Sequence, residues 1–170
     1  SRSPIQAGAE LYGYKGIDAD IEVIVLMLSS LQLLNITNIT LSLGNTAIFN
    51  ALCASANLEI KDVTVLRDIF RRKSVPDLES FLSKNKIKDA DKFKSLISLD
   101  GNEEVLEKAN GIFKSIPTIV DAINDLAKLN EFFKDQNIDV MFDLGEVKAY
   151  EYHDGVVFAA YSDKFSKAIA

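Results

Sequence analysis

Polar residues that could recognise a small charged ligand gather near the two ends of this sequence. Near the beginning, Gln6 and Glu10 flank Gly8 in the run Gln-Ala-Gly-Ala-Glu. Side chains two residues apart lie on one face of a β-strand, and a glycine between them leaves space for a ligand. A carboxylate placed there could pair with an ammonium group, and an amide could bind a carboxylate or an amine. A solvated strand face with a bulge glycine is the simpler alternative.

The second group of polar residues precedes the dipeptide Asp154-Gly155, close to the other end of the chain. It consists of a cation, Lys148, and two aromatic residues with polar tips, Tyr152 and His153. Such side chains suit an imidazole ligand. Adjacent strand residues point to opposite faces, so Tyr152 and His153 need not meet the same ligand. His153 could instead be a turn residue paired with Asp154.

The composition argues against several other kinds of site. A single cysteine, Cys53, and a single histidine are too few for a zinc site or a Cys/His catalytic pair, so we predict no metal, no cofactor and no catalytic residue. Cys53 lies in an apolar run, which predicts a buried side chain. The net charge of −6 argues against a nucleic-acid partner. The local basic cluster is predicted to be the solvated face of a helix end; it comprises Arg67, Arg71, Arg72 and Lys73.

Period-two and helical patterns predict the elements that must position these residues. Alternating residues predict a strand over Ile5–Tyr12, and Asp18 is then expected to cap a buried helix that ends near Leu34. A second strand is predicted over Ile39–Leu43, ended by Gly44, and Asn45 is expected to cap the next helix.

Most of the remaining chain, from about residue 45 to residue 136, has a helical pattern broken at residues 74–76 and 100–101. Asn102 is expected to cap one of its helices, and Pro117 suits the first turn of a longer one. Strands are predicted again over Ile138–Phe142 and in a hairpin of residues 147–152 and 156–161. This order predicts an α+β fold, with a largely antiparallel sheet flanked by helices and a helical insertion. No apolar run is long enough to span a membrane.

Two motifs resemble those of a known family. The run Gln6–Gly13 with the acidic helix start Asp18–Glu22 is similar to the motif 2 strand and next helix of histidyl-tRNA synthetases. The run Glu146–Phe158 resembles the histidine-specific signature of the same family. Their order and spacing, over essentially the whole chain, imply a class II aminoacyl-tRNA synthetase-like domain. The resemblance also implies a histidine-like ligand site formed by Gln6, Glu10, Lys148, Tyr152 and His153.

Two departures distinguish this chain from the synthetases. Lys148 stands where the synthetases have an arginine that helps to activate the histidine carboxylate, and lysine cannot copy its bidentate fork. His153 stands where a second tyrosine is usual. The form Tyr-His-x-Gly-Val-Val-Phe-Ala-Ala-Tyr resembles instead the non-catalytic regulatory subunits of ATP phosphoribosyltransferase. Lys148 departs from the arginine of that family too. A fragment of an authentic histidyl-tRNA synthetase is the alternative, and a helical scaffold whose end motifs are coincidental is a third.

The resemblance implies a role in histidine biosynthesis without aminoacylation. Members of the regulatory family activate a short catalytic subunit and take part in feedback by histidine. A catalytic-subunit partner, a homodimer within a hetero-oligomer and a cytoplasmic location are therefore expected. The resemblance also implies that residues 1–170 are one synthetase-like domain of a longer protein, without the first-motif region and a C-terminal segment.

Overall fold

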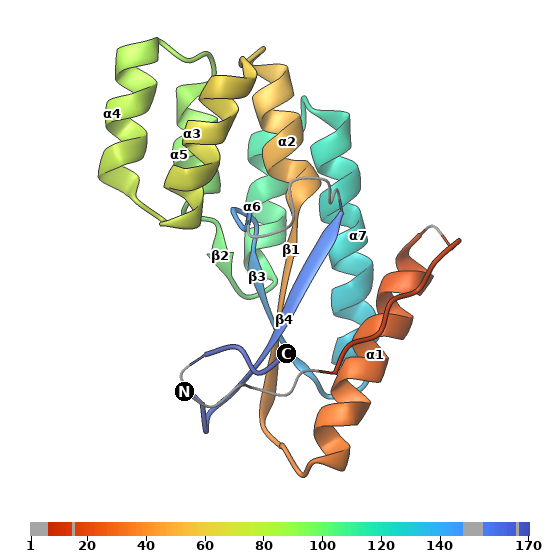
Figure 1. The fold of residues 1–170 in the computed structure, drawn as a ribbon. Helices are drawn as coiled ribbons and strands as arrows, with labels where there is room; N and C mark the ends of the chain where they lie inside the picture. The colour runs from red at the N-terminus through yellow and green to blue at the C-terminus, as the bar shows by residue number, and fades with distance from the viewer. Residues whose placement is uncertain (1–6, 15, 148–154, 166) are drawn as a thin grey trace. The chain divides into compact units, whose positions relative to one another are not determined.

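The structure is a computed structural model that describes residues 7–14, 16–147, 155–165 and 167–170 (Figure 1). It contains two compact units, residues 1–37 and residues 38–170. The expectation of a single synthetase-like domain over residues 1–170 stays a prediction. Each unit is described separately below.

The predicted strand at the start of the first unit is wrong over its described part. Residues 7–14 have no strand or helix and their side chains are exposed. A strand is stable only where a neighbouring strand takes up its backbone hydrogen bonds. Among the described residues no strand pairs with this segment, because every pairing lies between residues 39 and 162. The small side chains of the Ala-Gly-Ala run also contribute little packing.

The helix of the first unit is α1, Ile17–Leu33, close to the predicted range. Asp18 does not cap it, because the N-cap is Gly16 with a φ of 124°, and this helix has no side-chain cap hydrogen bond. Asp18 lies instead within the first turn, where a carboxylate is favoured by the helix dipole. The expectation of burial all round is also wrong, since Leu26 is 50% and Leu33 is 85% exposed.

The second unit is built on a four-stranded sheet of order β2-β3-β1-β4. The strands are β1 (Ile39–Asn45), β2 (Asp100–Gly101), β3 (Asp139–Asp143) and β4 (Val156–Ser162). The pairs β1–β4 and β2–β3 are antiparallel, whereas β1 and β3 are parallel. Strand β1, expected to end at Gly44, continues to Asn45. The Asn45 side chain accepts a bond of 3.0 Å from the Ala47 amide and caps the next helix, as predicted.

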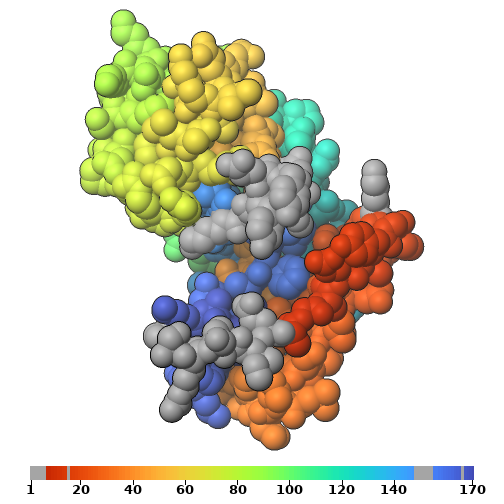
Figure 2. Space-filling view, viewed as in Figure 1, coloured from red at the N-terminus to blue at the C-terminus, as the bar shows by residue number. Residues whose placement is uncertain are grey.

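The parallel pair β1–β3 needs a crossover connection, which the helical insertion supplies. Its helices are α2 (Thr46–Ser55), α3 (Ile60–Arg71), α4 (Val75–Asn85), α5 (Ala90–Leu96), α6 (Glu104–Phe113) and α7 (Pro117–Lys134). Glu103, and not the expected Asn102, directly precedes α6, but the Asn102 side chain accepts a 3.2 Å bond from the Glu104 amide at the start of this helix. Helix α7 begins at Pro117, as expected. The break at residues 100–101 is the short strand β2. In the space-filling view, α3 and α4 lie side by side on the surface (Figure 2).

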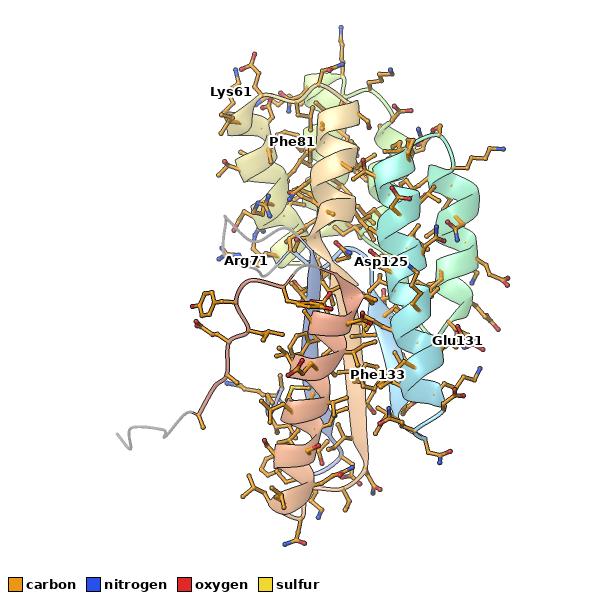
Figure 3. The ribbon with its side chains drawn as sticks, turned by 90° about the vertical axis from the view of Figure 1, so that its right-hand side faces the viewer. Lys61, Arg71, Phe81, Asp125, Glu131 and Phe133 are labelled. Atoms are coloured by element: carbon orange, nitrogen blue, oxygen red, sulfur yellow. The ribbon has the colours of Figure 1, made fainter. Side chains whose placement is uncertain are left out.

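The core of the second unit lies between α2, α7 and one face of the sheet. Leu41 and Leu43 of β1 and Phe133 of α7 are fully buried. Figure 3 shows Phe133 on the side of α7 that faces the strands and Glu131 on the outer side. Because strand side chains alternate, burying Leu41 and Leu43 turns their neighbours Ser42 and Gly44 to the opposite face. That opposite face carries the candidate site.

Candidate functional site

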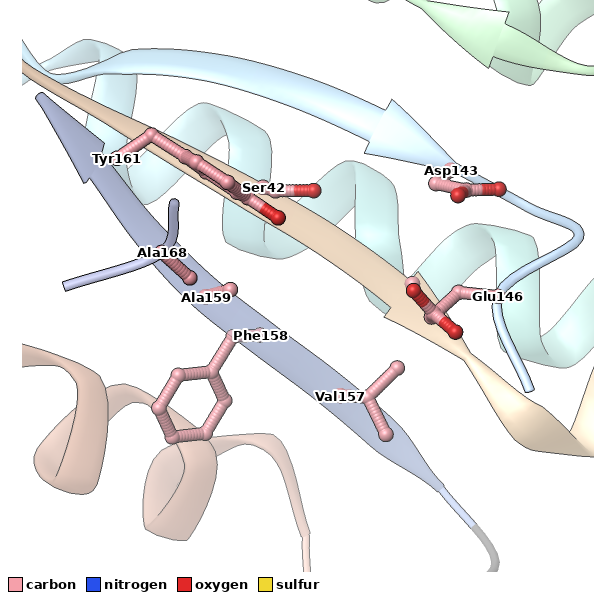
Figure 4. Close-up of a pocket in the computed structure, with 9 residues that line it drawn as sticks. Ser42, Asp143, Glu146, Val157, Phe158, Ala159, Tyr161 and Ala168 are labelled. Carbon is pink, nitrogen blue, oxygen red and sulfur yellow. The ribbon is translucent and has the colours of Figure 1, made fainter. Parts of the chain in front are cut away.

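A pocket of about 300 Å³ lies on the face of the sheet opposite to Leu41 and Leu43 (Figure 4). Strands β1 and β4 form its floor, and the turn after β3 forms one end. Ser42 pairs with Ala159, and Gly44 pairs with Val157, so these residues share one face. The full lining is Ser42, Gly44, Asp143, Glu146, Val157, Phe158, Ala159, Tyr161 and Ala168.

The pocket floor can form only because Gly44 has no side chain. A Cβ atom at this position would lie 2.8 Å from the Asp143 carbonyl oxygen and 3.1 Å from the Glu146 Cβ. It would also lie 3.1 Å from a Val157 methyl group. A backbone oxygen at that distance cannot move without shifting the turn, so Gly44 allows the turn after β3 to approach β1.

Polar groups line the pocket at its end and along one side. Figure 4 shows the Asp143 and Glu146 carboxylates and the Ser42 and Tyr161 hydroxyls on the same side of the sheet. The Glu146 Oε1 accepts a bond of 2.8 Å from the Val147 amide, which orients this carboxylate. Two carboxylates and two hydroxyls can accept hydrogen bonds from an ammonium or an imidazolium group. This arrangement favours a small ligand with a positive end.

The turn that supplies these carboxylates, residues 143–146, is held by the helical insertion. Lys73, at the end of α3, donates to Asp143 Oδ1 at 2.5 Å, and the Gly145 amide donates to the same oxygen at 3.1 Å. The Leu144 amide donates to the Leu99 carbonyl at 3.0 Å. Asp143 is therefore neutralised by a lysine that precedes it by 70 residues.

The described ends of the run Glu146–Phe158, which carries the histidine-specific signature, line the pocket. Glu146 is the first residue of this run and Val157 lies near its other end, and both are in the pocket wall. At the second end, Thr46 is only 1% exposed and bonds Gly155 three times. Its amide donates to the Gly155 carbonyl at 2.9 Å, and its hydroxyl contacts the same carbonyl at 3.3 Å and accepts from the Gly155 amide at 3.2 Å.

Four of the five residues predicted to form the site lie outside the described residues: Gln6, Lys148, Tyr152 and His153. So do Asp154 and residues 148–152 of the predicted hairpin, whereas the other hairpin strand is confirmed as β4. Glu10 is described and exposed, and its carboxylate accepts a hydrogen bond from the Tyr12 hydroxyl. This bond, together with the negative charge of Glu10, raises the pKa of Tyr12. The predicted site as a whole stays a prediction.

The described pocket residues were missed by reasoning from the sequence. The alternation of β1 placed Ser42 opposite Leu41 and Leu43, which is the signal that could have located the pocket floor. Asp143 follows the predicted strand Ile138–Phe142 and is the last residue of β3, and the end of a strand is a frequent position for a functional carboxylate. No local spacing, however, connects Asp143 with Lys73.

Two further predictions concern residues away from the pocket. Cys53 is buried, as expected, and burial raises the pKa of its thiol to about 12, so it is a poor nucleophile. The basic cluster is engaged by acidic and polar partners: Arg71 and Arg72 bind Asp68, and Arg72 also binds Asp77. Arg67 donates to Asn50 at 2.8 Å and lies over the Phe49 ring. Arg71 and Arg72 therefore agree with the predicted solvated helix end, whereas Arg67 is part-buried within α3 and Lys73 binds Asp143 at the pocket.

The described part of the chain contains no group of three or more histidine, cysteine, aspartate or glutamate side chains that could hold a metal ion. Within the same residues, no helix is long and apolar enough to cross a membrane.

The comparisons with known proteins agree with the two motifs. The family model of histidyl-tRNA synthetase matches residues 1–170. The chain belongs to this family. It is 35% identical over its whole length to the ATP phosphoribosyltransferase regulatory subunit of Cellvibrio japonicus. It is also 36% identical over its whole length to the subunit of the same name from Pseudomonas fluorescens. In both cases it spans 44% of the relative's length.

Solved structures show the same fold. A Bacillus halodurans protein described as an ATP phosphoribosyltransferase regulatory subunit/histidyl-tRNA synthetase is similar with a TM-score of 0.78 at 25% identity. The similarity covers 92% of this chain and 42% of that one. A histidyl-tRNA synthetase from Nostoc gives a TM-score of 0.70 at 14% identity, over 86% and 37% of the two chains. The expected α+β, class II synthetase-like fold is therefore confirmed.

Proposed function

We propose that this chain is part of a regulatory subunit of ATP phosphoribosyltransferase and serves histidine biosynthesis. The observation that carries the proposal is whole-chain identity of 33–36% to curated proteins of that name. In this role the subunit assembles with a short catalytic subunit, as a homodimer within a hetero-oligomer in the cytoplasm. It activates that partner and contributes to feedback by histidine.

The fold neighbour from Thermotoga maritima supports the partner, because it is described as an ATP phosphoribosyl transferase complex of two proteins, HisG and HisZ. That likeness has a TM-score of 0.69 at 15% identity and covers 90% of this chain and 54% of that one. It shows a shared fold, and it only motivates the proposed partner. The catalytic partner of the present chain is accordingly part of the proposal.

The pocket on the open sheet face is the proposed ligand site. Its volume of about 300 Å³ suits a molecule of amino-acid size, at the lower end of ligand sites. Its carboxylates and hydroxyls suit a ligand with an ammonium or imidazolium group. We propose L-histidine as the ligand of this pocket. The motif-based prediction that Gln6, Glu10, Lys148, Tyr152 and His153 bind a histidine-like ligand is kept as part of the proposal.

The competing function is aminoacylation by an authentic histidyl-tRNA synthetase, which the matching family model alone would favour. Lys148 is the residue that argues against it, because lysine cannot replace the bidentate contact of arginine with a carboxylate. The regulatory protein is therefore expected to form no histidyl adenylate. Pyrophosphate exchange with histidine and ATP measures this on a full-length protein that contains the chain. Histidine-dependent exchange well above background would favour the synthetase.

The regulatory role is tested with the same full-length protein and a short catalytic subunit from the same source. Titration of the regulatory protein into the catalytic subunit should raise the rate at which phosphoribosyl-ATP forms. Added L-histidine should then lower that rate. A constant rate, with complex formation established separately by analytical ultracentrifugation, would contradict the proposed activation.

A further inference from the structure

The Asp143–Glu146 turn lies between the pocket and the helical insertion, and it contacts both closely. On the pocket side, a Cβ atom at Gly44 would come within 2.8 Å of Asp143 and 3.1 Å of Glu146. On the other side, a Cβ atom at Gly145 would lie 2.9 Å from the Leu96 carbonyl oxygen and 3.2 Å from the Lys73 Nζ. A turn packed this closely on both sides cannot move without moving one of its neighbours.

Lys73 brings a cation into this packing, from the segment between α3 and α4. Its Nζ donates to Asp143 Oδ1 at 2.5 Å, and the Gly145 amide donates to that same oxygen. The Lys73 side chain is 37% exposed and that of Asp143 is 23% exposed, so the pair is partly shielded from water. Shielding strengthens an ion pair relative to a fully exposed one.

We infer that Lys73 is a positioning residue that couples the helical insertion to the polar end of the pocket. It acts through Asp143: the ammonium group fixes the carboxylate, the carboxylate fixes the Gly145 amide, and the turn then places Glu146 in the pocket wall. A partner that displaces α3 or α4 would therefore alter the pocket, and a ligand in the pocket would alter the insertion. The effect on ligand binding rests on the proposed function, in which the pocket binds L-histidine. The positioning of the turn by Lys73 does not depend on it.

The ligand-free test uses amide hydrogen exchange in the full-length protein, compared between Lys73→Met, Lys73→Arg and Lys86→Met. Lys86 is a matched control, because it also has a φ of 50° after a helix and lies at the end of α4. Exchange of the Gly145 amide should become about five- to tenfold faster in Lys73→Met, since local protection depends on local contacts. It should be unchanged in Lys86→Met and largely restored in Lys73→Arg, which keeps the charge.

Amides of α7 report global stability in the same experiment and should exchange at the wild-type rate. If the Gly145 amide of Lys73→Met exchanges like that of the wild type, or accelerates only together with α7, Lys73 does not position the turn and the inference is wrong.

The ligand-bound test is a double-mutant cycle on L-histidine affinity, measured by calorimetric titration. Lys73→Met and Asp143→Asn should each weaken binding by about three- to fivefold, the usual range for a partly exposed pair. The double variant should bind like Asp143→Asn alone, because Lys73 acts only through that carboxylate. Additive losses would overturn the inference. If the wild type binds no histidine, the proposed ligand is wrong, and the exchange of the Gly145 amide alone decides whether Lys73 positions the turn.

Discussion

Two segments of this protein carry a carboxylate that could meet a cationic ligand, and they hold it in different ways. In residues 7–14, Glu10 is exposed and accepts a hydrogen bond from Tyr12, two residues along the chain. In the Asp143–Glu146 turn, Asp143 accepts bonds from a lysine of the helical insertion and from the Gly145 amide. Glu10 thus has a neutral local donor, whereas Asp143 is already paired with a cation.

This difference suggests separate roles for the two carboxylates. A ligand's ammonium group gains most by pairing with a carboxylate that carries an uncompensated charge. Among the described residues, no ion pair involves Glu10, while Asp143 is neutralised by Lys73. Glu10 is therefore the better candidate to bind a ligand cation, and Asp143 is better placed to fix the shape of the pocket.

The largest expected effect is on ligand affinity. Glu10→Gln should weaken L-histidine binding to the full-length protein by about 1.5–3 kcal/mol, the usual contribution of a charged hydrogen bond. Asp143→Asn should weaken it less, because the Asp143 carboxylate is already paired with Lys73. Calorimetric titration of both variants measures the two losses. A larger loss in Asp143→Asn would reverse the roles, and unchanged binding in Glu10→Gln would mean that Glu10 does not contact the ligand.

The second prediction concerns the close approach that forms the pocket. Gly44→Ala should destabilise the protein by about 1–3 kcal/mol, because the added methyl group meets a backbone oxygen and two side chains. Gly111→Ala is the matched control: Gly111 lies inside α6 and a Cβ atom there meets nothing within 4 Å. Alanine should stabilise that helix by about 0.5–1 kcal/mol. Urea unfolding gives the free energy of unfolding of both variants. If Gly44→Ala is no less stable than Gly111→Ala, the steric argument is wrong.

The two strands predicted at the ends of the chain show why part of the fold could be inferred from the sequence. Val156–Ser162 is rich in β-branched and aromatic residues, and it pairs with β1 along seven residues. The run before Tyr12 has the same alternation, but it is built of small residues and has no strand beside it among the described residues. Alternation shows which face a strand would bury; it does not supply the partner strand that makes the strand form.

The site was harder to predict than the fold because it depends on contacts between distant residues. Lys73 and Asp143 are 70 residues apart, and their contact follows from the position of the helical insertion against the end of β3. The parallel pairing of β1 with β3 also depends on the helical insertion, because parallel strands need a crossover connection. The two-residue strand β2 exists only because Asp100 pairs with Asp143. None of these features has a local sequence signal.

The third prediction tests the anchor at the other end of the signature segment. Thr46→Val keeps the shape of the side chain but removes the hydroxyl that accepts from the Gly155 amide. Leaving a part-buried amide without that acceptor should lower the free energy of unfolding by about 1 kcal/mol. Thr64→Val is a control, because the Thr64 hydroxyl is exposed and bonds only within α3, to Ile60. If both variants lose the same stability, the Thr46 hydroxyl does not anchor Gly155.

The smallest expected effect is a change in the titration of Tyr12, and it reports directly on the charge of Glu10. The hydrogen bond to Glu10, followed by the negative charge of the same carboxylate, raises the pKa of Tyr12 because both disfavour the phenolate. Glu10→Gln removes the charge, so the pKa of Tyr12 should fall toward its ordinary value. The absorbance of tyrosinate against pH measures this, with Tyr12→Phe subtracted to isolate one of five tyrosines.

Saturating L-histidine makes the same titration a test of the role of Glu10. If the ligand's ammonium pairs with Glu10, it takes the place of the Tyr12 hydroxyl and compensates the carboxylate charge. Both changes lower the pKa of Tyr12 in the wild type, whereas in Glu10→Gln the ligand should leave it unchanged. A wild-type pKa that does not respond to saturating histidine would show that the ligand's cation lies elsewhere. The pocket carboxylates would then be the groups that bind it, and Glu10 and Asp143 would differ only in the groups that hold them.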